Sequence, residues 1–215
     1  MSALERNAPR IRRGQRPPAG ADVRSQGKGA RGRLLSSGLM QRMTRGSPRI
    51  AFVTYVSAAG ALIVANFWQG YVPGAWQAAV LFVAGLVAWT LFEYLVHRYV
   101  YHLVSESEVG AQLTYMMHGL HHEFPRDHSQ MFVPPLVLVP VGTVLFGLMY
   151  AVLGTRTLMF FSGFLIGYVA HACLHYCIHH FRPPRMLKFL WRHHLLHHYR
   201  CPDLAYGVSS PLWDR

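Results

Sequence analysis

Four long apolar stretches constrain the fold of this chain more than any other feature of its sequence. They run over residues 50–68, 75–92, 134–153 and 158–178, and each is about 20 residues long, near the length that a helix needs to cross a bilayer. Only 14% of the residues are charged, whereas soluble domains usually carry about 25%. A soluble fold of this size would have too little polar chain to cover four such stretches. We therefore predict an all-α integral membrane protein with four transmembrane helices.

Short glycine-containing loops at residues 70–74 and 154–156 predict that these helices pair into two hairpins. Residues 93–133 and 179–215 then fall on the same side of the membrane, where we expect them to form a helical cap. All fourteen histidines lie at or after His97, either in these two segments or at the adjoining helix ends. The topology therefore predicts a histidine-rich site in the cap.

The net charge of +12 belongs almost entirely to the N-terminal segment. Residues 1–49 hold twelve Lys or Arg and two Asp or Glu, whereas residues 50–215 hold nine and seven. The first segment has no apolar period and predicts a disordered basic tail, followed by one membrane-embedded domain over residues 50–215. Arginine beside a first membrane helix favours a cytoplasmic N-terminus and cap, although a transit peptide remains an alternative. No aromatic residues interleave the arginines, so we expect no nucleic-acid partner.

Ten of the histidines form four motifs whose spacing suits metal ligation. Residues three or four apart share one face of a helix, whereas a five-residue step needs a helix end or local unwinding before its two side chains can converge. Ten neutral imidazoles suit iron, zinc or copper, and they are too many for one ion but enough for two. The motifs are H-x4-H (His97 and His102), H-x2-H-H (His118, His121 and His122), H-x3-H (His175 and His179) and a second H-x2-H-H (His194, His197 and His198).

Other residues near the motifs are interpreted as support for the ligands. Carboxylates that could accept the outer N–H of a ligating imidazole are Glu93, Glu123, Asp127 and Asp203. Glu93 is the strongest candidate because it lies one turn before His97, although a plain interfacial acid is an equal alternative. We interpret Cys173 and Cys177 as helix-packing residues and not as ligands. The four remaining histidines are expected to be structural or to contact the ligands: His128, His171, His180 and His193.

The four motifs and their flanking residues resemble the fatty acid hydroxylase/sterol desaturase superfamily, and most closely the fatty acid 2-hydroxylases. The resemblance covers roughly residues 90–215. It implies two metal ions held by the ten motif histidines, with iron expected and zinc able to substitute, and O2 as co-substrate. It also implies a separate electron donor of the cytochrome b5 or ferredoxin type. The flanking matches include His118-Gly119-Leu120-His121-His122-Glu123-Phe124-Pro125-Arg126-Asp127 and Tyr206-Gly207-Val208-Ser209-Ser210-Pro211-Leu212-Trp213-Asp214.

The reaction that this resemblance implies is hydroxylation of a lipid acyl chain, such as 2-hydroxylation of a fatty acid or of a ceramide-type sphingolipid. Asp127 and Tyr199 are candidates for proton handling. Sterol, carotenoid and lipid-headgroup substrates remain alternatives, as does a membrane protein that stores or transports metal. Transporters bind near the bilayer midplane, whereas these histidines lie at helix ends, which favours catalysis. Residues that could line an acyl path, or simply pack, are Phe124, Met131, Phe132, Tyr168 and Phe181.

Overall fold

The computed structural model describes residues 46–72 and 74–215, and this part of the chain contains helices and loops but no strand. The basic tail predicted for residues 1–49 therefore lies outside the described residues as far as residue 45. Four long helices match the four apolar stretches, with ends that differ by at most four residues. They are α3 (Pro48–Gln69), α4 (Ala75–Val96), α7 (Pro135–Leu153) and α8 (Thr157–His180).

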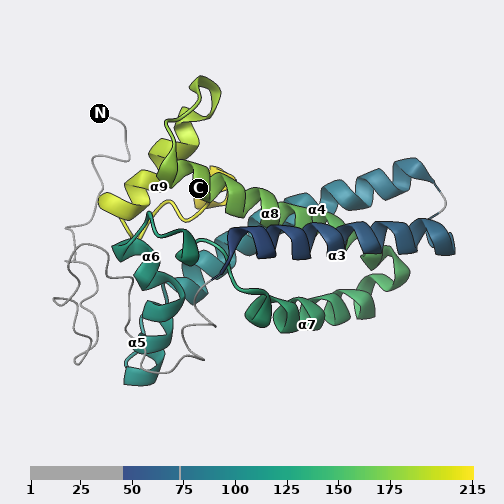
Figure 1. The fold of residues 1–215 in the computed structure, drawn as a ribbon, viewed down its shortest axis with the longest axis horizontal. Helices are drawn as coiled ribbons and strands as arrows, with labels where there is room; N and C mark the ends of the chain where they lie inside the picture. The colour runs from purple at the N-terminus through teal and green to yellow at the C-terminus, as the bar shows by residue number, and fades with distance from the viewer. Residues whose placement is uncertain (1–45, 73) are drawn as a thin grey trace.

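Within the described residues, three continuous helical segments are long and apolar enough to cross a membrane: Pro48–Gln69, Ala75–Tyr101 and Leu136–His180. The third segment contains both α7 and α8, which are separated by the single 3-10 turn η4 (Gly154–Arg156). The chain reverses at this turn, as it does between α3 and α4, so α7 runs antiparallel to α8 and α3 antiparallel to α4 (Figure 1). The main packing partner of both α3 and α4 is α8. The prediction of an all-helical fold is confirmed for the described residues, and its long helices are apolar enough to span a membrane. The division into four transmembrane crossings stays a prediction.

Local sequence signals explain where α3 begins and ends. Ser47 caps the N-terminus, where its side chain accepts a hydrogen bond from the Ile50 amide at 3.5 Å, and Pro48 occupies the first helical position. Gly70 ends the helix in the left-handed conformation, with φ of 63°, and the Tyr71 amide donates back to the Asn66 carbonyl. Glycine adopts this conformation without steric cost, so the chain turns sharply towards α4.

The core lies where α8 packs against α3 and α4. The ring of Tyr168 is edge-on to Tyr55 of α3 and to Trp89 of α4, with centroids 5.0 and 5.2 Å apart. Two glycines let the α4 and α8 backbones approach closely, because a Cβ on Gly85 or on Gly163 would lie 1.9 Å from a carbonyl oxygen of the other helix. This packing fixes α4 relative to α8. The predicted ligand His97 directly follows α4, and His175 and His179 lie in the last two turns of α8.

The remaining helices gather at one end of the long helices, where the histidines also lie (Figure 1). Two five-residue π-helices continue regular helices in this cap, and π-helical turns are frequent at functional sites. The cap elements are the π-helices η1 (His97–Tyr101) and η2 (Tyr115–Gly119) and the α-helices α5 (Glu108–Thr114), α6 (Leu120–Glu123) and α9 (Lys188–Tyr199).

Candidate metal centre

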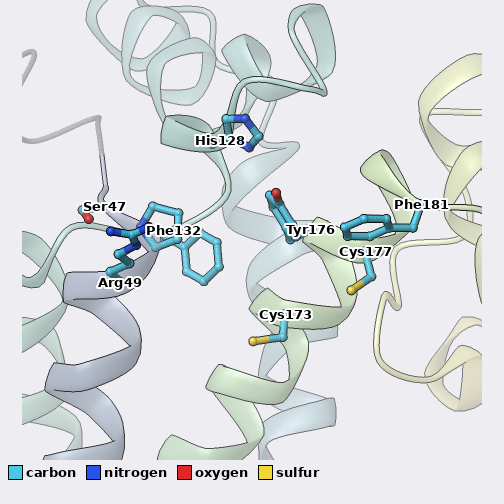
Figure 2. A pocket seen from close by; sticks show the side chains of 9 residues that line it. Ser47, Arg49, His128, Phe132, Cys173, Tyr176, Cys177 and Phe181 are labelled. Atoms are coloured by element: carbon cyan, nitrogen blue, oxygen red, sulfur yellow. The ribbon is translucent and has the colours of Figure 1, made fainter.

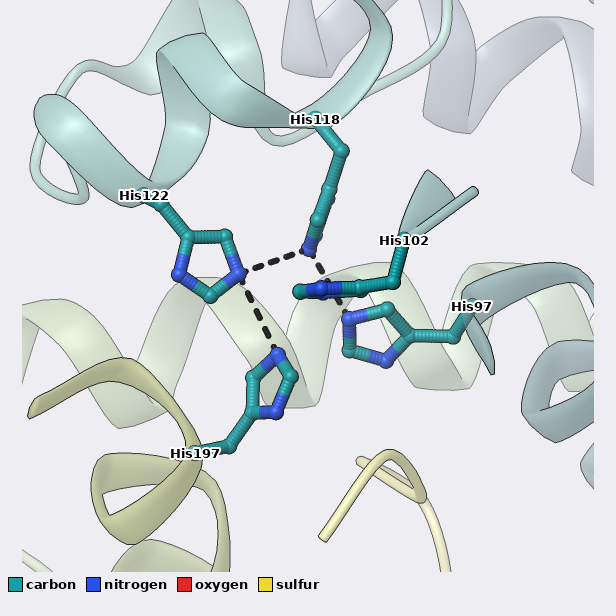
Figure 3. A group of neighbouring side chains, drawn as sticks. All are labelled: His97, His102, His118, His122 and His197. Carbon is teal, nitrogen blue, oxygen red and sulfur yellow. Dashed lines mark hydrogen bonds between the residues drawn. The ribbon is translucent and has the colours of Figure 1, made fainter. Parts of the chain in front are cut away.

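The structure brings all ten motif histidines together in two groups of five. Within each group, one ring nitrogen from every histidine lies within 4.8 Å of the corresponding nitrogens of the other four. Figure 3 shows the first group, in which the imidazoles approach one another from η1, from η2 and α6, and from α9. The first group is His97, His102, His118, His122 and His197, and the second group is His121, His175, His179, His194 and His198.

The spacing of the ring nitrogens fits a shared ion. In the first group, Nε2 of His118 lies 2.8 Å from Nε2 of His97 and 3.0 Å from Nε2 of His122. In the second group, Nε2 of His179 lies 3.0 Å from Nε2 of His194. Two nitrogens bound to one metal at about 2.1 Å and at right angles are about 3.0 Å apart, so these separations suit adjacent ligands.

Two buried nitrogens give a second indication of fit. Nε2 of His102, from the first group, and Nε2 of His175, from the second, have no hydrogen-bond partner among the described residues. Buried polar atoms without a partner are rare in proteins because their desolvation is costly. A metal ion would satisfy each nitrogen within its own group of donors, and the two groups therefore have the chemistry of a two-metal centre.

The H-x4-H motif works through a change of helix type. The amide of His102 donates to the carbonyl of His97 at 3.2 Å, which is the five-residue hydrogen bond of a π-helix. The wider turn brings residues five apart to the same face, and the two rings have centroids 5.1 Å apart. The predicted local unwinding at this motif is confirmed.

Each H-x2-H-H motif divides between the two groups, although we expected its three side chains to point to one side. In the first motif, His121 joins the second group while the histidines on either side of it in the motif join the first. In the last motif, His197 joins the first group while His194 and His198 join the second. The rings of His122 and His198 stack across the boundary with centroids 4.2 Å apart. The two groups are therefore immediate neighbours.

The environment keeps these imidazoles neutral and available as ligands. Burial lowers the pKa of His102 to about 4. Burial, with a smaller contribution from the neighbouring His102, lowers the pKa of His197 to about 3. Burial and then the nearby His197 lower the pKa of His122 to about 2. A metal ligand must offer an unprotonated nitrogen, so every one of these shifts favours metal binding near pH 7.

The outer hydrogen bonds come from the C-terminal loop and not from the expected carboxylates. His97 donates its Nδ1 proton to the carbonyl of Tyr206 at 2.5 Å, and His197 donates to the carbonyl of Leu204 at 2.8 Å. The expectation that Glu93 would accept a proton from a neighbouring ligand is wrong, because Glu93 contacts His171 and two backbone amides instead. Sequence spacing missed the Tyr206 carbonyl because it lies 109 residues from His97. It missed the Leu204 carbonyl, only seven residues from His197, because any residue type provides a carbonyl.

The other candidate residues lie outside the two groups. Asp127 caps a short 3-10 helix (His128–Gln130), where it accepts hydrogen bonds from the amide and hydroxyl of Ser129. Tyr199 is 66% exposed. Their proton-handling role stays a prediction.

The histidines outside the four motifs have structural contacts. His193 pairs with Asp214 at 2.9 Å, and His171 pairs with Glu93 at 3.1 Å. His180 stacks between Tyr176 and His128, with ring centroids 4.1 and 4.7 Å away.

A cavity of about 760 Å³ lies beside α8 and is lined by Phe132, Cys173, Tyr176, Cys177 and Phe181, with Arg49 at its edge (Figure 2). Cys173 and Cys177 also pack against the hydrophobic core, as the sequence predicted. They are two residues from His175 and His179 and hence about 200° around the helix. The cavity therefore lies on the face of α8 opposite the metal ligands, and the predicted acyl path through Phe132 and Phe181 stays a prediction.

Comparisons with known proteins agree with this geometry. The chain is 36% identical to a dihydroceramide fatty acyl 2-hydroxylase of Arabidopsis thaliana over 61% of this chain and 56% of the relative. It is 34% identical to a ceramide very long chain fatty acid hydroxylase of Saccharomyces cerevisiae over 64% of this chain and 37% of the relative. It is 37% identical to human fatty acid 2-hydroxylase over 62% of this chain and 37% of the relative.

The fold is also similar to a solved structure. The structure of scs7p, in which only the hydroxylase domain is visible, matches with a TM-score of 0.71 and 28% identity over 84% of this chain and 69% of that chain. The chain spans between 37% and 56% of the length of the curated relatives compared above. Residues 82–215, which include all ten motif histidines, match the model of the fatty acid hydroxylase family, and the chain belongs to that family.

Proposed function

We propose that this chain is a two-metal, O2-dependent hydroxylase of a lipid acyl chain, with 2-hydroxylation of a fatty acid or ceramide-type lipid as the reaction. The observation that carries the proposal is the pair of adjacent, buried five-histidine groups at one end of a bundle of apolar helices. The names of the relatives support the acyl substrate, since they describe 2-hydroxylation of fatty acyl groups and hydroxylation of very long chain fatty acids.

The residues of the chain hold and shield the reaction centre. The first group would bind one ion through His97, His102, His118, His122 and His197, and the second would bind the other through His121, His175, His179, His194 and His198. When bound, two iron ions supply the O2-activating redox chemistry that an unactivated C–H bond requires and that no side chain offers. Seven of the ten motif histidines are buried, and His194 and His197 have no exposed surface, so the protein keeps bulk water away from most of the ligand shell.

The charge distribution supports four membrane crossings with the cap in the cytoplasm. Of the nine Lys and Arg in residues 50–215, eight lie in the cap or in the segments that adjoin it, and Arg156 alone lies at the opposite turn. Cytoplasmic segments of membrane proteins carry this excess of Lys and Arg. A cytochrome b5 or ferredoxin type donor would then deliver electrons from the cytoplasmic side.

The decisive experiment combines metal analysis with turnover. Protein purified without oxygen should contain two iron ions per chain. With an electron donor and a long-chain fatty acid or ceramide, it should consume O2 and release a 2-hydroxy product that mass spectrometry detects. A matched pair, His197→Ala and Tyr199→Phe, separates a metal ligand from an exposed neighbour: the first should abolish turnover, and the second tests the proposed proton role. Tightly bound metal with no turnover under any donor would instead support metal storage or transport.

A further inference from the structure

The segment 204–214, which we call the C-terminal clasp, ends in a short 3-10 helix, and among the described residues its hydrogen bonds to motif histidines reach the first metal group only. Its carbonyls at Leu204 and Tyr206 accept the Nδ1 protons of His197 and His97, both from the first group. An imidazole that donates through one nitrogen keeps a lone pair on the other, so the clasp fixes the tautomer and the ring orientation of both ligands. The free nitrogens point inwards, where Nε2 of His97 lies 2.8 Å from that of His118.

Two carboxylates hold the clasp through four consecutive backbone amides. Asp214 accepts the amides of residues 206 and 207 at 2.7 and 2.9 Å, and Glu93 accepts those of residues 208 and 209 at 2.5 and 2.9 Å. Glu93 is 5% exposed and belongs to α4, one turn before His97. The indole of Trp213 donates to Thr90 of the same helix at 3.0 Å. The clasp is thus fastened to the helix that leads directly into the first group.

The backbone of the clasp is shaped for this contact. Ala205, between the two carbonyl-bearing residues, has φ of 62°, a left-handed conformation that is uncommon for any residue except glycine. Such conformations persist where the surrounding structure enforces them, and they cluster at functional sites. At Gly207 a Cβ would lie 2.1 Å from the Ser210 carbonyl and 2.8 Å from Asp214, so no other residue fits without moving the carboxylate.

The second group has a different outer environment. The outer Nδ1 atoms of His121, His194 and His198 are buried and have no hydrogen-bond partner within residues 46–72 and 74–215. No hydrogen bond joins the clasp to any of these three imidazoles in that part of the chain. The two groups therefore match in their number of inner ligands but differ in how those ligands are held.

We propose that the C-terminal clasp makes the two metal positions inequivalent, with Glu93 and Asp214 as positioning residues that raise the affinity of the first group for its ion and leave the second group unaffected. The inference rests on the proposed function for the presence of two ions. Outer hydrogen-bond partners typically change metal affinity by about 10- to 100-fold, which sets the size of the expected effect.

The test uses the full chain in detergent, loaded with Zn²⁺ and equilibrated against a graded series of a competing chelator. The metal content per chain then gives the affinity of each ion. Glu93→Ala should weaken one ion by about 10- to 100-fold and leave the other unchanged. Glu93→Gln keeps an oxygen that can accept both amides and should restore most of the affinity. Glu123→Gln, at an exposed carboxylate that contacts Tyr115, is the matched control and should have no effect.

Two adjacent histidines identify which ion is affected. His197→Ala removes a ligand of the first group, and His198→Ala removes a ligand of the second. In the His198→Ala background, Glu93→Ala should weaken the remaining ion by the full factor. In the His197→Ala background, it should not change the remaining ion. The visible absorption of Co²⁺-substituted protein provides a second readout of the same assignment.

Equal weakening of both ions, or weakening only in the His197→Ala background, would overturn the inference. If Glu93→Ala fails to fold, Asp214→Asn in the same two backgrounds provides the test. Asp214 accepts one clasp amide through each carboxylate oxygen, whereas asparagine has one oxygen and can accept only one of them. Unchanged affinity of the first group in that variant would also overturn the inference. A failed proposed function is distinct from these results, since the parent chain would then bind fewer than two ions or show no O2-dependent turnover.

Discussion

Gly85 and Gly163 let α4 and α8 pack in close contact. Replacing either glycine with alanine should therefore lower the stability of the fold, whereas the same replacement at an open helical position should not. A Cβ at either site would lie 1.9 Å from a carbonyl oxygen of the facing helix, Phe160 or Phe82 respectively. Ordinary carbon–oxygen contact is about 3.2 Å, so the helices must separate by more than about 1 Å. Alanine in place of helical glycine gains up to about 1 kcal/mol, whereas overpacking a fitted interface costs about 1–3 kcal/mol. Gly85→Ala and Gly163→Ala should each be destabilising by about 1–2 kcal/mol.

Gly147 provides a matched control for this prediction. It lies within α7, and a Cβ there would meet nothing within 4 Å. Gly147→Ala should therefore leave the stability unchanged or raise it by up to about 1 kcal/mol. Thermal unfolding of the three variants in the same detergent measures the difference. If all three substitutions shift the midpoint in the same direction, the close approach of α4 and α8 does not limit the stability of the fold and the reasoning is refuted.

Four further predictions follow from the site. Metal-free protein should lose stability as the pH falls below 6.5: the unfolded chain takes up protons that the folded chain refuses, because His102 and His197 have folded pKa values of about 4 and about 3. The loss approaches about 1.4 kcal/mol per pH unit for each such histidine, and a melting temperature that stays flat between pH 7.5 and 5.5 would contradict it. Removing the metal with a chelator should lower the melting temperature at pH 7.5, and Zn²⁺ should restore it. Ala205→Gly should keep its metal and gain about 1 kcal/mol by relieving the left-handed alanine, whereas Ala205→Val should lose stability; the two melting curves decide. Asp127→Ala should cost about 1 kcal/mol through loss of the cap, with no change in metal content per chain.

Most of the local structure could be predicted from the sequence because it depends on local periodicity. An apolar stretch of about 20 residues predicts a helix wherever its neighbours lie, and the glycine-containing loop at residues 70–74 predicts the turn that Gly70 makes. The spacing of the H-x3-H motif likewise predicts that His175 and His179 share a helical face, and both belong to the second group. The same reasoning is wrong for the two H-x2-H-H motifs, whose three side chains divide between the groups. The step from His97 to His102 even predicts a departure from α-helical geometry, which the structure provides as a π-helix.

The outer support of the site could not be predicted because it depends on tertiary placement. Glu93 lies one turn before His97 in the sequence, and that spacing suggested a direct contact. In the structure its carboxylate is occupied by the amides of residues 208 and 209, more than 110 residues later in the chain. Glu93 therefore contacts His97 only indirectly, by holding the segment whose Tyr206 carbonyl accepts the hydrogen bond from His97. Every residue has a backbone carbonyl, so neither residue type nor motif spacing indicates which carbonyl accepts a hydrogen bond.

Each H-x2-H-H motif supplies ligands to both metal groups, and this sharing holds the two groups together as one centre. Adjacent residues, His121 with His122 and His197 with His198, supply different groups. Consecutive Cα atoms are 3.8 Å apart, so two side chains that leave neighbouring positions can serve different ions only if those ions are close together. The rings of His122 and His198, one from each group, stack directly on each other and show that the two groups are in contact. Two independent structural metals would need no shared motif, whereas two ions that act on one small molecule would have to be held at short range. The shared motifs therefore support the proposed oxygenase function more than metal storage.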